Sequence, residues 1–223
     1  MDTVNISMSV IVLLVAMALA FDFMNGFHDA ANAIATVVST RVMKPHTAVA
    51  MAAICNVAAI FVFELKVAAT VGKGTIEPFA IDYYVIFGAL AGAIAWNVIT
   101  WYYGIPSSSS HALIGGLIGP ALVHAGPEAL IASGVIKVVA FILISPLLGM
   151  VLGSLMMILV SWLFRNTTPR RVDKWSRLLQ LFSASAYALG HGGNDAQKTI
   201  GIIWMLLLSA GMMQPGDHVP YWV

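Results

Sequence analysis

Gly26-Phe27-His28-Asp29-Ala30-Ala31-Asn32-Ala33 is a short polar stretch in sequence that is otherwise apolar enough for a membrane. A related stretch, Gly192-Gly193-Asn194-Asp195-Ala196-Gln197-Lys198-Thr199, lies near the other end of the chain. We call them the first and second polar segments. Their aspartates are 166 residues apart (195 − 29), and an isoleucine follows each segment. Charged groups at bilayer depth are costly and usually face an interior site, so two matched copies indicate an internal repeat built around such a site.

Composition places the chain in a membrane. Hydrophobic residues make up 60% of the 223 residues and charged residues only 9%, whereas a soluble domain carries about 25% charged residues. We therefore expect an all-α integral membrane protein with the lipid bilayer as its surroundings. The net charge of +1 gives no reason to expect nucleic-acid binding. The single Cys55 has no partner for a disulfide or a thiol metal site.

Apolar stretches of about 20 residues mark the candidate spans. The first runs from about Ile6 to Thr40 and contains the first polar segment, so we expect it to be broken there. The other candidates are residues 46–63, 83–103, 112–123, 129–164 with an interruption at Ser145-Pro146, and 178–213 with the second polar segment at its middle. Two topologies remain open. Either the polar insert Gly104 to His111 belongs to a span and 129–164 crosses once, or the insert is re-entrant and 129–164 crosses twice.

Lys and Arg in short loops set the orientation of a membrane protein. Five of them crowd residues 165–177, which we expect to form a basic cytoplasmic loop, and this places the N-terminus outside. The loop divides the chain into a first transmembrane repeat, residues 1–164, and the start of a second repeat, residues 178–223. The two polar segments then lie in spans of opposite direction, which is the arrangement of an inverted repeat.

The polar segments offer ligands for a hard cation. Each has a glycine within three positions of its aspartate, which predicts an unwound stretch whose backbone oxygens line a cavity. Asp29 and Asp195 supply negative charge, and Asn32 and Asn194 supply neutral oxygens. This set suits Na⁺, Mg²⁺, Ca²⁺ or a proton better than a soft metal. The alternative is that each aspartate only caps a broken helix.

Three further polar residues are candidates for binding the coupling ion. Asp22 lies seven residues before Asp29 and is expected on the same helical face, as a second carboxylate. Lys198 lies three residues after Asp195 and is placed to pair with it. His28 adjoins Asp29 and can exchange protons near neutral pH, although a lone histidine is more often a structural hydrogen-bond donor.

The insert Pro106-Ser107-Ser108-Ser109-Ser110-His111 suits an anion. Proline followed by serines marks a helix start, where free amides and the positive end of the helix dipole can hold an oxyanion such as phosphate. We expect Ser107, Ser108, Ser109 and Ser110 to supply its hydroxyls and amides, together with the amides of Asn32 and Asn194. The alternative is that the hydroxyls bond back to their own helix and only ease packing.

At these residues the chain resembles the inorganic phosphate transporter (Pit) family, in its bacterial proton-coupled, low-affinity form. That family carries a Gly-Ala-Asn-Asp-Val-Ala-Asn-Ala-like word in each inverted half and a Pro-x-Ser-Thr-Thr-His-like box later in each half. Residues 26–33 match the first word, 106–111 the first box and 192–199 the second word. The resemblance implies a helical bundle with broken helices and phosphate between the halves. It also implies secondary import of phosphate, in some members as a complex with a divalent metal, across the bacterial inner membrane.

Two positions bear on the coupling ion. Sodium-coupled members of the family keep asparagine at the positions filled here by His28 and Lys198. The Lys198 ammonium could occupy the place of a bound Na⁺, so the resemblance favours proton over sodium symport. No cofactor beyond this coupling cation is expected.

The second serine box is expected near residue 273 (107 + 166), but the sequence stops at Val223. We therefore expect one full repeat and the opening of another, and a need for either a homodimer or a missing C-terminal half.

Other functions remain open at this point. A sulfate or other oxyanion permease of the same family would carry the same motifs. A non-transporting membrane subunit or fragment that needs a partner chain is also compatible with the sequence. An intramembrane hydrolase could use Ser107 and His111, which share a helical face at i, i+4. The sequence, however, has no Gly-x-Ser-x-Gly elbow, and a hydrolase would leave the repeated aspartates unexplained. We therefore do not expect an enzyme.

Overall fold

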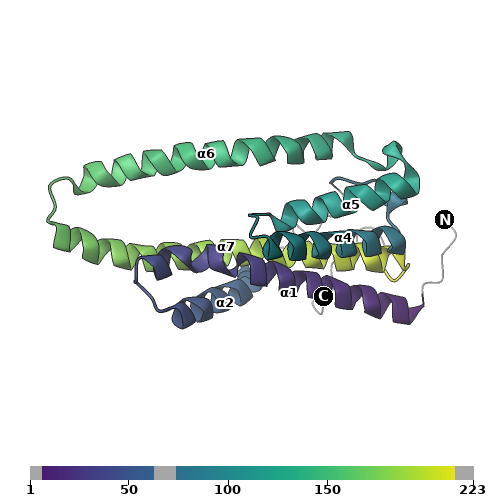
Figure 1. Cartoon of the computed structure of the whole chain (residues 1–223), viewed down its shortest axis with the longest axis horizontal. Helices are drawn as coiled ribbons and strands as arrows, with labels where there is room; N and C mark the ends of the chain where they lie inside the picture. Colours follow the sequence, from purple (N-terminus) through teal and green to yellow (C-terminus); the bar gives the residue numbers. More distant parts are fainter. Residues whose placement is uncertain (1–6, 63–73, 214–223) are drawn as a thin grey trace.

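The computed structural model describes residues 7–62 and 74–213, and this part of the chain is nearly all helical (Figure 1). Its α-helices are α1 (Met8–Ser39), α2 (Pro45–Val62), α4 (Tyr83–Tyr102), α5 (Ser109–Ala125), α6 (Ala132–Phe164) and α7 (Pro169–Ser209). Two single-turn 3-10 helices, η1 (Pro78–Ala80) and η2 (Pro127–Ala129), lie in the connections. The predicted all-helical fold is confirmed over these residues. The expected repeats also include residues 1–6, 63–73 and 214–223, which lie outside the described part.

Four of the described helices, α1, α2, α4 and α6, are long and apolar enough to cross a membrane. Their apolar side chains are largely exposed, which suits a lipid environment and not water. The prediction of a membrane protein is therefore confirmed.

The polar segments do not break their helices, and this corrects the prediction of unwound stretches. The first lies in the middle of α1 and the second in α7, and both helices are continuous through them. A glycine inside a helix costs only about 1 kcal/mol relative to alanine, which packing along a long helix offsets. Gly192 has a packing role instead, because a Cβ atom there would lie 2.5 Å from Cα of Asn56 on α2.

The helices also exclude one of the two open topologies and correct the bounds of the basic loop. Residues 132–164 form one helix that passes through Pro146, so the topology in which this stretch crosses twice is excluded. The basic loop is mostly helical, because α7 begins at Pro169 and only the turn from Arg165 to Thr168 separates it from α6. Proline is favoured at the first position of a helix, where its missing N–H costs nothing, and this explains the early start of α7.

α1 and α7 form the centre of the molecule. They run side by side in opposite directions, while α2 packs on α7, and the α4–α5 pair lies along the other half of both helices (Figure 1). The largest buried cluster joins side chains of α1, α4, α5 and α7, among them Phe21, Leu90, Leu117 and Met205. This packing holds the two polar segments against the start of α5.

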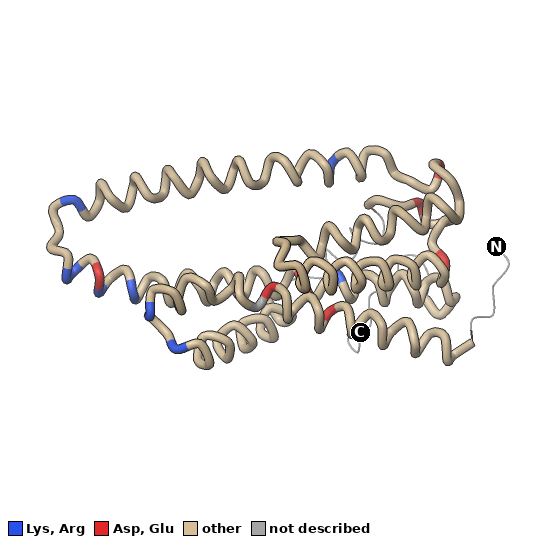
Figure 2. Tube along the Cα trace, in the orientation of Figure 1, with Lys and Arg blue, Asp and Glu red and all other residues tan. Residues whose placement is uncertain are grey.

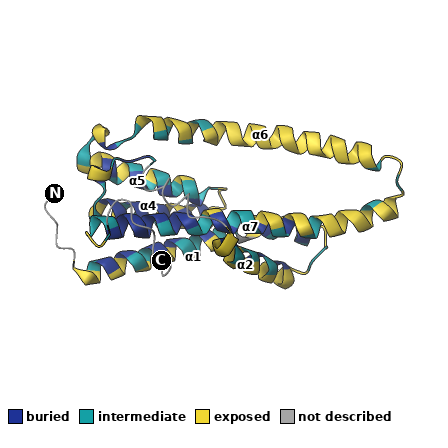
Figure 3. Ribbon diagram, turned by 180° about the vertical axis from the view of Figure 1, so that it is seen from behind, coloured by how far each residue is buried: buried dark blue, intermediate teal, exposed yellow. Residues whose placement is uncertain are grey.

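Charge and burial are both uneven along the molecule. Lys and Arg gather at the end formed by the α6–α7 turn, the start of α7 and the α1–α2 turn (Figure 2). The helix α6 stands apart from the bundle, and none of its residues is buried (Figure 3).

Candidate functional site

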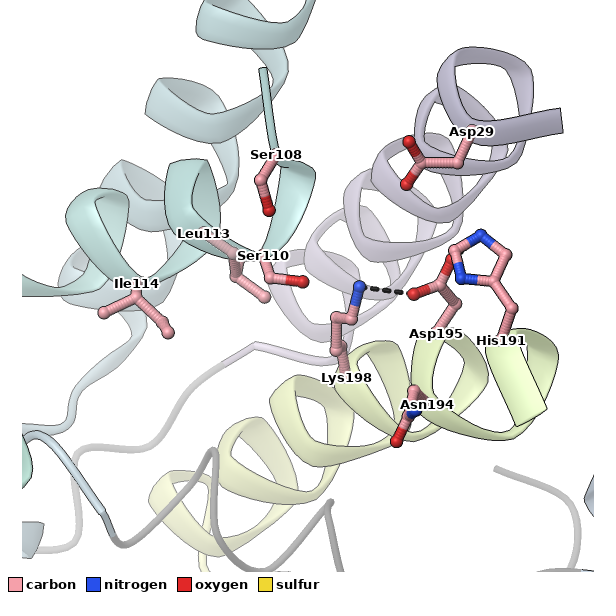
Figure 4. A pocket seen from close by; sticks show the side chains of 9 residues that line it. All are labelled: Asp29, Ser108, Ser110, Leu113, Ile114, His191, Asn194, Asp195 and Lys198. Carbon is pink, nitrogen blue, oxygen red and sulfur yellow. Dashed lines mark hydrogen bonds and ion pairs between the residues drawn. The ribbon is translucent and has the colours of Figure 1, made fainter. Parts of the chain in front are cut away.

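A cavity of about 430 Å³ opens where α1, the start of α5 and the middle of α7 meet (Figure 4). Polar and charged groups from all three helices line it together with a small apolar wall. The lining residues are Asp29 of α1, Ser108, Ser110, Leu113 and Ile114 at α5, and His191, Asn194, Asp195 and Lys198 of α7. Both polar segments and the serine insert therefore reach one place.

The α7 side of the cavity is a row of three ionisable side chains. Asp195 lies between His191, whose Nε2 is 3.3 Å from a carboxylate oxygen, and Lys198, whose ammonium bonds the other oxygen. The three positions share one face because they are spaced at i, i+4 and i+7 on an uninterrupted helix. Lys198 is 8% exposed, and its pairing with Asp195 makes the burial of this ammonium tolerable.

The α1 side contributes Asp29, and each of its two carboxylate oxygens has a polar neighbour. Asn32 donates to one carboxylate oxygen at 3.2 Å, and the Ser109 hydroxyl lies 3.4 Å from the other. One ligand atom each from Asp29, His191 and Asp195 fall within 4.8 Å of one another, and Figure 4 shows these side chains converging. Two carboxylates and an imidazole are a ligand set that a divalent cation can use.

The four serines of the insert have different environments. Ser108 is the N-cap of α5, and its hydroxyl accepts from the backbone N–H of His111 at 3.5 Å. Ser108 and Ser110 face the cavity. Ser109 is buried and donates to Asn25 on α1, whereas Ser107 accepts a hydrogen bond of 2.9 Å from Trp96. The predicted helix start is thus present, three residues later than Pro106.

Other predicted site residues lie beside the cavity and not in its lining. Asn32 does not line the cavity but donates a hydrogen bond to Asp29, which does. Asp22 accepts a hydrogen bond of 2.8 Å from Thr199, one turn along α7 from Asp195. His28 is half-buried, and its Nε2 has no hydrogen-bond partner among the described residues.

Sequence reasoning missed two residues that hold the serine insert, Asn25 and Trp96. Asn25 is 2% exposed and lies one helical turn before Asp29, so its place on the same face was a usable signal. Trp96 had no such signal, because only the packing of α4 beside α5 brings its indole N–H to Ser107.

Known proteins resemble this chain along nearly its whole length. Residues 25–223 match the phosphate transporter family. The chain is 53% identical over 219 residues to a probable low-affinity inorganic phosphate transporter of Rhizobium meliloti (strain 1021), covering 98% of this chain and 66% of that protein. It is 44% identical over 214 residues to a protein of the same description from Bacillus subtilis (strain 168), covering 95% and 64%. The chain therefore spans just under two thirds of the length of these relatives.

A more distant relative and a solved structure extend the comparison. The low-affinity inorganic phosphate transporter PitA of Escherichia coli (strain K12) is 33% identical over 231 residues, which are 89% of this chain and 46% of that protein. The solved structure of a sodium-dependent phosphate transporter superposes with a TM-score of 0.81 at 20% identity, covering 96% of this chain and 72% of that one. At this identity the superposition shows a shared fold.

Proposed function

Because this chain belongs to the phosphate transporter family, we propose that it imports inorganic phosphate as part of a secondary active transporter in a bacterial inner membrane. The cavity between α1, α5 and α7 would hold phosphate together with the coupling cation. One observation carries this proposal: the start of α5, with Ser108 and Ser110, and two carboxylates, Asp29 and Asp195, line the same cavity.

Phosphate is expected at the start of α5. The first amides of this helix point out of its N-terminus, and the hydroxyls of Ser108 and Ser110 border the same space. Amides, hydroxyls and the positive end of the helix dipole suit an oxyanion. The Asn194 amide and the Lys198 ammonium lie on the opposite wall, where they can donate further hydrogen bonds. Ser109 would act by positioning the insert, whereas Ser107, which bonds Trp96 and does not line the cavity, is not expected to bind phosphate.

The coupling cation is expected at Asp29 and Asp195. The ion pair with Lys198 already places a positive charge beside Asp195, which favours a proton over Na⁺ as the transported cation. Thr199 lies one turn along α7 from Asp195, and Asp22, its hydrogen-bond partner, lies about two turns along α1 from Asp29. Asp22 is therefore a candidate relay toward the cavity, and His28, next to Asp29, is another.

Uptake into proteoliposomes that contain the assembled transporter tests the coupling. We expect phosphate entry to follow an imposed pH gradient, to stop when a protonophore is added, and to be the same with and without Na⁺. Uptake that requires Na⁺ and ignores the protonophore would show the opposite coupling.

Binding tests the phosphate site separately from transport. We expect Ser110→Ala to weaken binding of radiolabelled phosphate by the purified chain by about tenfold, the value of one hydrogen bond to a charged group. Ser107→Ala is the matched control, because its hydroxyl already serves Trp96 outside the cavity. Equal loss in the two variants would contradict this placement.

The choice between phosphate and sulfate depends on Asp29. Protonated phosphate can donate a hydrogen bond to a carboxylate, whereas sulfate at neutral pH cannot. Sulfate should therefore compete poorly with phosphate in the wild-type chain and better in Asp29→Asn. Strong competition by sulfate in the wild type would favour the oxyanion permease.

A metal–phosphate complex is a second candidate substrate. The convergence of Asp29, His191 and Asp195 favours it, since carboxylate oxygens and an imidazole together suit Mn²⁺ or Zn²⁺. Phosphate uptake that rises with added Mn²⁺ and carries radiolabelled Mn²⁺ in equal amounts would support it, and phosphate uptake without accompanying metal would exclude it.

Alternating access would come from two inverted halves that move against each other. The antiparallel course of α1 and α7 supports this proposal, because each carries one polar segment (Figure 1). A second copy of the chain or a further C-terminal segment would supply the remaining helices.

A further inference from the structure

One end of the molecule concentrates positive charge. Residues 41–44 and 165–177 hold seven of the chain's 11 Lys and Arg residues and a single carboxylate, Asp173. Figure 2 shows them gathered at the end formed by the α6–α7 turn, the start of α7 and the α1–α2 turn. These cations, which we call the basic end, are Arg41, Lys44, Arg165, Arg170, Arg171, Lys174 and Arg177, and all are exposed.

The two parts of the basic end are joined directly. The Arg177 guanidinium donates to the backbone carbonyl of Arg41 at 3.4 Å and also bonds Asp173 at 3.0 Å. This contact fixes the α1–α2 turn against α7. The basic end is therefore a single surface and not two separate loops.

The start of α7 is amphipathic. Val172, Trp175, Leu179 and Phe182 are spaced by three or four residues and so form one stripe. Arg171 borders this stripe, while Arg170, Lys174 and Arg177 lie on the other side of the helix. Trp175, Leu179 and Phe182 are 53%, 54% and 75% exposed. An exposed apolar stripe beside a row of cations is suited to the boundary between lipid tails and headgroups.

The length of α6 also places the basic end at the depth of the lipid headgroups. α6 has 33 residues and is about 50 Å long, whereas the hydrocarbon core of a bilayer is about 30 Å thick. Its end therefore reaches the headgroup layer. Trp162 lies near this end, under the Arg165 guanidinium at 5.3 Å, and tryptophan is typical of the membrane–water interface.

We propose that the basic end binds the headgroups of anionic phospholipids such as phosphatidylglycerol. Guanidinium groups donate paired hydrogen bonds to phosphate oxygens, and the apolar stripe packs against the lipid tails. Excess Lys and Arg on one side of a membrane protein also set its orientation, but orientation alone needs neither the stripe nor the joining of the two parts. The proposal is independent of what the cavity transports.

Lipid binding by the purified full chain tests the proposal. The chain in neutral detergent micelles is titrated with phosphatidylglycerol or phosphatidylcholine, and bound lipid is counted by native mass spectrometry. Each cation near an anionic surface contributes about a fivefold change in affinity, so Arg170→Gln/Arg171→Gln/Lys174→Gln should weaken phosphatidylglycerol binding roughly 100-fold. Phosphatidylcholine binding should not change. Added NaCl should lower the phosphatidylglycerol affinity of the wild type toward that of the triple variant, because salt screens the charges.

Two single variants provide the matched comparison. Lys174→Gln removes one charge from the basic end and should weaken phosphatidylglycerol binding about fivefold. Lys137→Gln removes one exposed charge near the other end of α6 and should have no effect. Circular dichroism checks that the variants keep their helices. Excess inorganic phosphate should not displace the lipid, which separates this surface from the cavity.

Three results would overturn the proposal. The triple variant could bind phosphatidylglycerol like the wild type, or Lys174→Gln and Lys137→Gln could weaken it equally. Inorganic phosphate could also displace the lipid. The first two would leave the basic end as an orientation signal only, and the third would make it a site for free anions.

Discussion

Ser109 shows how much the position of one hydroxyl matters in the serine insert. It is 3% exposed and donates to Asn25, whereas Ser107 accepts from Trp96 at a more exposed site. Ser109→Ala would leave the buried Asn25 oxygen without its donor, at a cost of about 1–3 kcal/mol. We expect a clear fall in the thermal unfolding temperature of the detergent-solubilised chain. Ser107→Ala should lower it little, and equal losses would contradict the assignment of Ser109 as the structural member.

The Lys198–Asp195 pair gives a second prediction at this scale. Their side chains are only 11% and 15% exposed, so removing one partner leaves a poorly solvated charge. Lys198→Met should therefore lower the free energy of unfolding by about 3 kcal/mol, as measured by denaturation in mixed micelles. Lys198→Met/Asp195→Leu should recover most of this loss, because no charge then remains unpaired. A double variant no better than the single one would show that the pair does not act as a unit.

At the scale of the helix, the glycines of the two polar segments should respond oppositely to alanine. A Cβ atom at Gly192 would lie 2.5 Å from Cα of Asn56, whereas one at Gly26 would meet nothing within 4 Å. Gly192→Ala should destabilise by about 1–3 kcal/mol through overpacking of α2 against α7. Gly26→Ala should be neutral or stabilise by up to about 1 kcal/mol, since alanine is the better helix former. Thermal unfolding of the two variants is the test, and loss in both would mean that α1 needs the glycine for flexibility.

Helix identity was easier to predict than helix continuity. The long apolar stretches and the proline–serine start predicted most of α1, α2, α4 and α6, and they located the start of α5 within three residues. The predicted helix breaks at the polar segments and at Pro146 were wrong. A glycine or proline in the sequence indicates only how much it destabilises a helix locally. Contacts such as Gly192 with Asn56, which decide whether that cost is offset, are made only in the folded chain.

Part of the site could also be predicted from the sequence. Asp29, Asp195, Lys198 and the serines were identified because charged and hydroxyl groups stand out in apolar sequence. Which serines line the cavity could not be predicted, since only the orientation of α5 in the folded chain turns Ser108 and Ser110 toward it. The positions of Asn25 and Trp96 depend on the same packing.

The whole molecule divides into a packed bundle and one outlying helix, and their leucines should differ accordingly. Leu117 on α5 is 1% exposed, whereas Leu148 on α6 is 53% exposed. Leu117→Ala should destabilise the chain by about 2–5 kcal/mol because it leaves a cavity, while Leu148→Ala should change the free energy of unfolding by less than about 0.5 kcal/mol. Denaturation in micelles, with the chain confirmed as a monomer, measures both. A large loss at Leu148 in the monomer would contradict the exposure of α6 outside the packed bundle.

The unbroken course of α7 has a mechanical consequence. About 24 residues, or roughly 36 Å of continuous helix, connect Arg171 to Asp195. A hinged helix would absorb a displacement at one end, but a stiff rod transmits it. Because α7 is continuous, tilting it by a few degrees about the basic end would move the Asp195 carboxylate by a distance comparable to the length of a hydrogen bond. Movement of the basic end at the membrane surface would thus be transmitted by α7 directly to the cavity.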